Sequence, residues 1–403
     1  MRKLWYMGLE PYKARYTLQL QDWNETVFKR RGINYELVHG DTLGNDQAIV
    51  TGQVLDAHGR TYFGMSQLMN LVAKMKAGEV THEDVVYFED MFQPGIESLP
   101  YIMNQVASAH RPRIFVRCLA QSIDPDDFVH VWGMRKWMGL YEKMVDSFVT
   151  GVLASNEEMV MHMKIAGWEA PLYNVSGLAF GKDEVRARVL GPLKPFNERT
   201  MRVGFAARWD QEKQPDFYMD LIEECHRRYP RGGIEFCIFS GAKLKSNNNS
   251  YMARTKDLQD RGMLVIYEDL EKNDYYALLN DTRVLFNCAL QDWVSNTVSE
   301  ADTLGCNVLY PAYRSFPETF SNDPGRLYIP WSLDDAINKL GVLLDQPHAN
   351  LGKISTWTDG TIDRICDIME TAGTIAEDGM GCKAGTWRRM DTDYRKHTHG
   401  SKY

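Results

Sequence analysis

The sequence of 403 residues lacks any long apolar run. No stretch approaches the roughly 18 to 20 apolar residues of a membrane-spanning helix, and the apolar run after Arg2 and Lys3 is too short for a signal peptide. The seven cysteines include no Cys-x-x-Cys pair, so neither a zinc knuckle nor a disulfide framework is predicted. We therefore expect a cytoplasmic protein with buried thiols and no membrane partner.

The sequence also has no excess of positively charged residues. Lysine and arginine total 46 against 54 aspartate and glutamate, and the resulting net charge of −8 excludes a uniformly basic nucleic-acid coat, although not a local basic cleft. Hydrophobic residues at 44% and charged residues at 25% exclude a disordered chain. The length favours two or three domains, and the sequence leaves the oligomeric state open.

Short apolar runs typical of parallel strands alternate with helical stretches along the chain, which predicts an α/β fold. Expected strands cover residues 3–7, 33–38, 84–88, 113–117, 147–153, 201–206, 234–239, 265–267, 284–287 and 308–310. Expected helices cover residues 18–31, 64–75, 96–106, 128–143, 217–228, 275–279, 297–304 and 362–371.

Residues 185–200 predict a domain boundary, because Gly191, Pro192 and Pro195 interrupt a stretch without clear periodicity. The strand–helix alternation then restarts. We expect two tandem Rossmann-like domains, residues 1–190 and 200–355, that face a central cleft. The C-terminal tail, from about residue 360 to 403, is expected either to cross back to the first domain or to be mobile.

Two cations follow the first expected strand of the second domain. Arg208 and Lys213 lie in the loop between this strand and the next helix. Fixed cations at the carboxyl end of a parallel strand suit a diphosphate, for which arginine supplies a planar fork and lysine a point charge. The alternative is a solvated turn with two surface cations.

A second polar loop and a short helix follow the strand over residues 284–287. Ser295 or Asn296 is a candidate helix cap, and the free amides of a helix N-terminus form an anion site. Glu300 lies one turn into the helix, where it can accept hydrogen bonds from a ribose diol, and Asp292 precedes it in the loop. The alternative is a loop acid and an ordinary helical surface residue.

Together these segments resemble the retaining glycosyltransferases of the GT-B fold, especially glycosyltransferase family 4. That family has Gly-Arg-x(4)-Lys after a strand, and this chain has Ala207 before Arg208 and Lys213. The family's Glu-x(7)-Glu signature corresponds to Asp292 and Glu300, with aspartate in place of the first glutamate. The resemblance covers residues 201–344 well and the first domain only in outline.

The resemblance implies a nucleotide-sugar donor, most simply a UDP-sugar, as co-substrate. It implies no cofactor, no metal ion and no protein nucleophile. Arg208 and Lys213 would hold the donor diphosphate, Asp292 the donor sugar and Glu300 the ribose. The other donor-binding candidates are Gly8, Val265, Tyr267, Ser295, Asn296 and Thr297. The aspartates at 124 and 126 have a D-x-D spacing, but they precede a helix and are not expected to bind metal.

The first domain of this fold chooses the acceptor. This chain lacks both the usual Gly-Gly pair of the opening loop and the histidine that follows the fourth strand in many relatives. Glu89 and Asp90 follow the expected strand over residues 84–88 and are candidates that face the cleft, the alternative being a plain pair of loop acids. Arg15 and Arg117 are the other acceptor-side candidates.

The opening is also similar to that of the DNA-modifying α-glucosyltransferases of tailed phages, in residues 7–10 and 16–23, the latter ending in Asp22 and Trp23. Cations with interleaved aromatic residues, which can track a phosphate backbone and stack on a flipped base, occur at Lys13, Arg15, Arg111, Arg113, Arg117, Trp132, Arg135, Lys136 and Trp137. The alternative is a scatter of surface cations.

We therefore predict transfer of glucose, or of a pentose such as arabinose, to a hydroxylated pyrimidine such as hydroxymethylcytosine in bacteriophage DNA, with DNA as partner in the host cytoplasm. The alternatives are a cytosolic glycosyltransferase acting on a glycan, a lipid-linked sugar or a small molecule, and a non-catalytic nucleotide-sugar-binding module.

Overall fold

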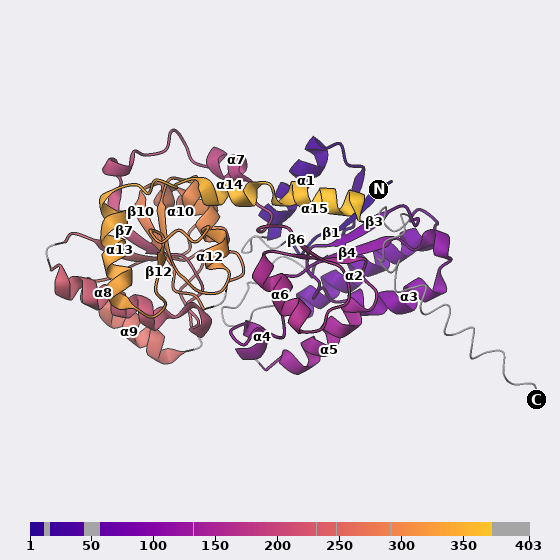
Figure 1. Ribbon diagram of the computed structural model, residues 1–403, viewed down its shortest axis with the longest axis horizontal. Coiled ribbons are helices and arrows are strands. Elements are labelled where there is room, and N and C mark those ends of the chain that lie inside the picture. Colours follow the sequence, from indigo (N-terminus) through magenta and orange to yellow (C-terminus); the bar gives the residue numbers. More distant parts are fainter. Residues whose placement is uncertain are drawn as a thin grey trace, which may run out of the picture.

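The computed structural model describes residues 1–11, 17–43, 57–131, 133–230, 232–246, 248–290 and 292–372. They form two six-stranded parallel sheets with helices packed around them (Figure 1). The predicted α/β fold with two tandem sheets is confirmed. Within the described part of the chain, no helix combines the length and the apolar character that a bilayer crossing needs.

The first sheet has the strand order β2-β1-β3-β4-β5-β6. Its strands are β1 (Leu4–Met7), β2 (Tyr35–Leu37), β3 (Val85–Phe88), β4 (Arg113–Arg117), β5 (Gly151–Ala154) and β6 (Leu172–Asn174). The helices around it are α1 (Thr17–Arg30), α2 (Ala57–Lys76), α3 (Leu99–Gln105), α4 (Phe128–Val131), α5 (Arg135–Asp146) and α6 (Glu157–Ile165). All four residues of β3 are buried, as expected for a parallel strand covered on both faces.

The second sheet has the order β12-β11-β10-β7-β8-β9, the arrangement of a Rossmann fold. Its strands are β7 (Thr200–Phe205), β8 (Glu235–Phe239), β9 (Val265–Tyr267), β10 (Thr282–Phe286), β11 (Asn307–Pro311) and β12 (Leu327–Tyr328). The accompanying helices are α8 (Pro215–Arg228), α9 (Asn249–Asp260), α10 (Lys272–Asn280), α11 (Asn296–Thr303), α12 (Phe316–Thr319) and α13 (Leu333–Asp345).

Some elements differ from the sequence-based expectation. The helix expected over residues 128–143 is two helices, α4 and α5, because the chain turns at Gly133 with a φ of 71°. The strand β6 and the helices α6, α9 and α13 were not expected. Residues 182–187, at the edge of the expected linker, form the short helix α7 (Lys182–Ala187).

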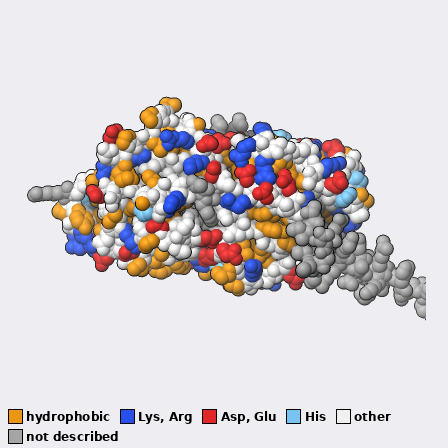
Figure 2. All heavy atoms as spheres, turned by 45° about the horizontal axis from the view of Figure 1, so that its top comes forward, with side chains coloured by type: hydrophobic (Ala, Val, Ile, Leu, Met, Phe, Trp, Pro, Cys, Tyr) orange, Lys and Arg blue, Asp and Glu red, His pale blue; other side chains and the backbone are white. Residues whose placement is uncertain are grey.

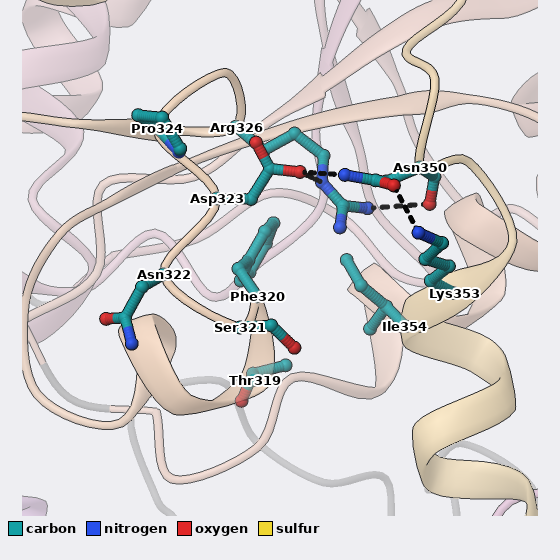
Figure 3. Close-up of a pocket in the computed structure, with 10 residues that line it drawn as sticks. All are labelled: Thr319, Phe320, Ser321, Asn322, Asp323, Pro324, Arg326, Asn350, Lys353 and Ile354. Carbon is teal, nitrogen blue, oxygen red and sulfur yellow. Dashed lines mark hydrogen bonds and ion pairs between the residues drawn. The ribbon is translucent and has the colours of Figure 1, made fainter.

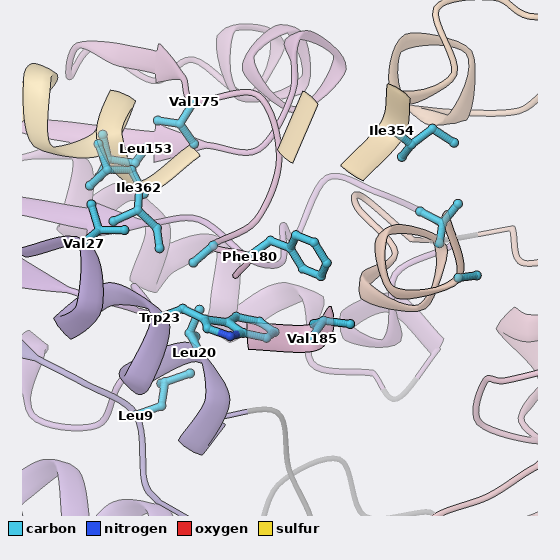
Figure 4. Packing of buried hydrophobic residues seen from close by; sticks show 14 of the residues in the cluster. Leu9, Leu20, Trp23, Val27, Leu153, Val175, Phe180, Val185, Ile354 and Ile362 are labelled. Carbon is cyan, nitrogen blue, oxygen red and sulfur yellow. The ribbon is translucent and has the colours of Figure 1, made fainter. Parts of the chain in front are cut away.

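The two sheets share part of one apolar cluster, which includes buried residues of α1, α7, α11 and α15. Trp23 of α1 packs edge-on against Phe180, with ring centroids 5.4 Å apart (Figure 4). Gly181 has no room for a side chain, because a Cβ atom there would overlap the Trp23 indole.

The last described helices return from the second sheet to the first. Figure 1 shows α14 (Lys353–Asp359) and α15 (Thr361–Thr371) running from the second unit to α1. Arg31 forms ion pairs with Asp363, Asp367 and Glu370, and Arg364 donates to the carbonyl oxygen of Val175 at 2.7 Å. Residues 373–403 lie outside the described part of the chain.

Candidate functional site

The site predicted in the second unit lies at the point where the strand order reverses. β7 and β10 are neighbours, β8 pairs on the far side of β7, and β11 pairs on the far side of β10. The loops that leave the carboxyl ends of β7 and β10 therefore emerge side by side, where doubly wound sheets bind ligands.

Backbone contacts hold these two loops together. The amide of Leu290 donates to the carbonyl oxygen of Glu212 at 2.9 Å, and the buried Cys288 thiol donates to the carbonyl oxygen of Lys213 at 3.3 Å. A short 3-10 turn over Gln211–Lys213 thus lies against the residues that precede Asp292.

The structure brings Arg208, Lys213 and Asp292 into this neighbourhood. Arg208 is 39% exposed at its side chain and donates to Glu212 at 2.5 Å. The side chain of Lys213 is only 9% exposed, and its Nζ lies 3.8 Å from a carboxylate oxygen of Asp292. This distance exceeds that of a hydrogen-bonded ion pair.

Helix α11 begins beside this pair. The Ser295 hydroxyl lies 2.8 Å from the Thr297 hydroxyl and 3.0 Å from the Tyr310 hydroxyl. Burial raises the pKa of Tyr310 well above its usual range, so this phenol stays neutral. Asn296 is the first residue of the helix, whose amides face the loop.

Glu300 is buried on α11 and is held from two directions. Its Oε1 accepts a hydrogen bond from the Tyr276 hydroxyl at 2.8 Å and lies 2.7 Å from Lys272 Nζ. The Tyr276 hydroxyl in turn accepts a bond from Gln19 of α1 at 3.1 Å, which links Glu300 to the first unit. No pattern in the sequence pointed to Tyr276, and Gln19 entered only as part of the segment 16–23 that is similar to the phage α-glucosyltransferases.

The other donor-side candidates lie apart from this cluster. The Tyr267 hydroxyl donates to Glu235, at the amino end of the neighbouring strand β8, at 3.1 Å. Val265 is on the same edge strand and is exposed. Gly8 follows β1 of the first sheet, where its carbonyl oxygen accepts a bond from Gln67 at 3.1 Å.

Glu89, expected to face the cleft, and Arg117, expected among the acceptor-side cations, are both buried. Glu89 accepts hydrogen bonds from Tyr6 at 3.2 Å and Asn24 at 3.1 Å, and burial raises its pKa to about 7. Arg117 donates to Ser155 at 3.2 Å and to the carbonyl oxygen of Gly177. In the sequence, both residues were placed only by their position at or just after the end of a strand. That position does not show that α1 and the segment after β6 cover their side chains.

Asp90 takes part in a buried ion network that sequence reasoning missed. Arg60 of α2 bonds Glu10 at 3.1 Å and also contacts Asp90. Glu10 and Asp90 follow neighbouring strands, β1 and β3, so Arg60 joins the carboxyl ends of the first sheet. Arg15, Lys13 and Trp132 lie outside the described residues.

The expected group of surface cations is only partly present. Arg111 and Arg113 are partly buried and donate to the carbonyl oxygens of Val106 and Ala372. On α5, Arg135, Lys136 and Trp137 are exposed. On the face in Figure 2, basic side chains are interspersed with acidic ones and form no continuous basic strip.

The loop after β4 meets the second unit through its acids. Arg314, which follows β11, contacts Asp124 at 3.0 Å and Asp126 at 2.5 Å. Asp127 of the same loop is buried, which raises its pKa to about 7, and the positive charge of Lys213 acts in the opposite direction. The D-x-D residues thus join the two units, and among the described residues no group of three or more potential metal ligands occurs.

Several glycosyltransferases of known structure have a similar fold. Sucrose-phosphate synthase from Thermosynechococcus elongatus has a TM-score of 0.59 and 11% identity, over 98% of this chain and 99% of that one. A trehalose-6-phosphate structure from E. coli, bound with UDP-2-fluoro glucose, has a TM-score of 0.58 and 10% identity, over 92% and 99% of the two chains.

S. aureus TarM, solved with UDP, has a TM-score of 0.51 and 12% identity over 81% of this chain. This chain spans only 59% of TarM. A comparison with protein-family models gives no match, and neither does a comparison with curated proteins. The neighbours are GT-B glycosyltransferases, so the predicted GT-B fold is confirmed.

Proposed function

We propose that this chain is a retaining, metal-independent glycosyltransferase that moves a sugar from a UDP-sugar to a hydroxylated pyrimidine base in phage DNA, within the host cytoplasm. The sugar is glucose or a pentose such as arabinose. One observation carries the proposal: Lys213 lies beside Asp292, and Arg208 belongs to the same loop as Lys213, where β7 and β10 end.

These residues suit the binding of a nucleoside diphosphate that acts as the leaving group of the reaction. Negative charge grows on UDP as its bond to the sugar breaks, and fixed cations that already face this charge lower the barrier. The acceptor hydroxyl oxygen attacks the anomeric carbon from the face that UDP leaves, and its proton passes to the departing phosphate oxygen. Asp292 holds a sugar hydroxyl, and Glu300 accepts from the ribose through Oε2, since its bonds to Tyr276 and Lys272 both end on Oε1.

DNA as acceptor has weaker support, from the opening of the sequence and from α5. Arg135 and Lys136 can contact phosphates, and Trp137, 54% exposed, can stack on a base. On the acceptor side we retain Asp90, at the carboxyl end of β3, next to the buried Arg60.

The test is to incubate the full chain with a panel of UDP-sugars and with plain or hydroxymethylated DNA, then to digest the DNA and weigh its nucleosides. A sugar-sized mass gain on the modified base is expected. Arg208→Ala should lower the rate by about 100-fold or more. Arg227→Ala is the matched control, because Arg227 is an exposed arginine on α8 that pairs with Glu224 of the same helix.

Other outcomes assign the chain to the alternatives. Donor hydrolysis without a DNA product would refute the DNA acceptor and favour a glycan, a lipid-linked sugar or a small molecule. UDP binding without any turnover would favour a non-catalytic module. Full activity of Arg208→Ala would refute the diphosphate assignment.

A further inference from the structure

A cavity of about 350 Å³ lies in the second unit, between the segment from α12 to β12 and the start of α14 (Figure 3). None of its lining residues belongs to the candidate donor or acceptor sites. Thr319, Phe320, Arg326 and Ile354 are buried, whereas Ser321 and Lys353 are exposed at its rim. The volume is within the range of pockets that hold small metabolites.

The guanidinium of Arg326 faces this cavity with one nitrogen whose N–H groups are not bonded to any described residue. The residue is 2% exposed, its Nε lies 3.3 Å from Asp323, and its Nη1 lies 3.6 Å from Asp302 and 3.3 Å from the carbonyl oxygen of Asn350. Its Nη2 has no hydrogen bond or ion pair with any residue that the structure describes. Figure 3 shows Nη2 directed into the space between Phe320 and Ile354.

Two carboxylates, those of Asp323 and Asp302, balance the charge of Arg326, but neither makes a short hydrogen bond with it. Its two carboxylate contacts are longer than the roughly 2.7–2.9 Å of a strong charged hydrogen bond. Asp323 also accepts bonds from Asn350 Nδ2 at 2.7 Å and from the amide of Gly325 at 3.0 Å. A buried guanidinium with a free donor is satisfied best by an anionic acceptor.

We propose that this cavity binds the phosphate or carboxylate group of a small metabolite. The anion accepts from Arg326 Nη2, with the Ser321 hydroxyl and the Lys353 ammonium at the rim, while Phe320 and Ile354 contact the apolar part of the ligand. In Figure 3 Ser321 lies next to Phe320, on the opposite side of the pocket from Lys353.

A ligand bound in this cavity would change the contacts that hold α11. Asp302 of α11 lies between Arg326 and the amide of Gly352, which donates to it at 2.9 Å just before α14. An anion that draws Arg326 away from Asp302 changes how α11 and α14 are held. The same helix carries Glu300, so this part of the proposal rests on the proposed donor site.

The cavity is tested by titrating inorganic phosphate, acetate and glucose 6-phosphate into the full chain by calorimetry, with UDP saturating so that the donor site is occupied. Ser321→Asp places a carboxylate over the cavity, and Ser321→Asn is its neutral control. Both residues tolerate the positive φ of 52° at this position.

We expect Ser321→Asp to weaken anion binding at least about tenfold, through like-charge repulsion, and Ser321→Asn to stay within about twofold of the native protein. Arg326→Gln should abolish binding, with thermal unfolding as the check on its fold. Stronger binding of the phosphates assigns a phosphate group, and stronger binding of acetate a carboxylate. Equal affinities of the native protein and Ser321→Asp would overturn the site.

The coupling between the cavity and α11 is tested by a separate measurement, the affinity for UDP. Phosphate should change the affinity for UDP in the native protein, and less so in Ser321→Asp, because coupling between two sites is reciprocal. An unchanged UDP affinity would overturn the coupling. If UDP does not bind at all, the donor proposal fails, and the phosphate titration without UDP still decides the cavity.

Discussion

Asn156 donates a hydrogen bond of 2.8 Å from Nδ2 to the carbonyl oxygen of Trp293, and this bond joins the first unit to the loop that carries Asp292. The Asn156 Oδ1 also accepts from the amide of Met159 at 2.8 Å and so caps α6. The Trp293 ring packs in the apolar cluster of the first unit, edge-on to His162. One buried side chain thus stabilises a helix and positions the candidate donor loop.

Substitutions of Asn156 should separate these two roles. Asn156→Ser keeps a good cap but is too short to reach Trp293, so it should reduce transfer and cost about 1–3 kcal/mol of stability for the lost buried hydrogen bond. Asn156→Ala loses the cap as well, and should cost about 1 kcal/mol more in the free energy of unfolding. Urea unfolding and initial rates measure the two effects. Native rates in Asn156→Ser would show that the bond does not position the loop.

Tyr276→Phe should weaken donor binding with little effect on turnover. The substitution removes one of the two groups that hold Glu300 Oε1 and leaves Lys272 in place. We expect the KM for the UDP-sugar to rise about three- to tenfold, with kcat within about twofold, as for an interaction made equally in ground and transition states. A fall in kcat at constant KM would contradict a role of Tyr276 in positioning the ribose-binding group.

The strands could be predicted well from the sequence because parallel strands are short apolar runs. The bounds of β4 and β9 match the expected ranges, and β1 and β8 differ by one residue at one end. Helix α9 escaped prediction, because only three of its twelve residues are buried and most of the others are polar. β6 has three partly buried residues and lacks the apolar run of its neighbours.

The candidate donor cluster could be predicted because its residues occur at fixed spacing within two segments. The contacts between the units could not, since Arg314 with Asp124, or Asn156 with Trp293, are distant in sequence and carry no motif. The sequence also did not show which side chains are buried. Arg117 ends a strand as a cleft residue would, but its side chain has no exposed surface.

The buried Glu89 should make the folded state less stable as the pH rises. Its pKa is about 7 in the folded protein, against an ordinary value of 4.5. Between these values the folded protein keeps a proton that the unfolded chain releases, so the free energy of unfolding falls from pH 4.5 to pH 7 and stays low above it. The shift corresponds to about 3 kcal/mol.

Glu89→Gln removes this titration. We expect the variant to gain stability relative to the native protein by up to about 3 kcal/mol as the pH rises from 5 to 8. Urea unfolding at pH 5, 6, 7 and 8 measures the difference. Asp127, whose pKa is also raised to about 7, is present in both proteins and cancels. Parallel stability curves would show that Glu89 is ionised throughout.

Two glycines should respond to alanine in opposite directions. A Cβ atom at Gly181 would overlap the Trp23 indole, which packs on Phe180 in the cluster shared by both sheets (Figure 4). Gly181→Ala should therefore cost about 1–3 kcal/mol through overpacking. Gly341 is exposed on α13 with no atom near its missing Cβ, so Gly341→Ala should add about 0.5–1 kcal/mol through helix propensity. Thermal or urea unfolding gives both signs, and a neutral Gly181→Ala would mean that Trp23 has room to move away from α7.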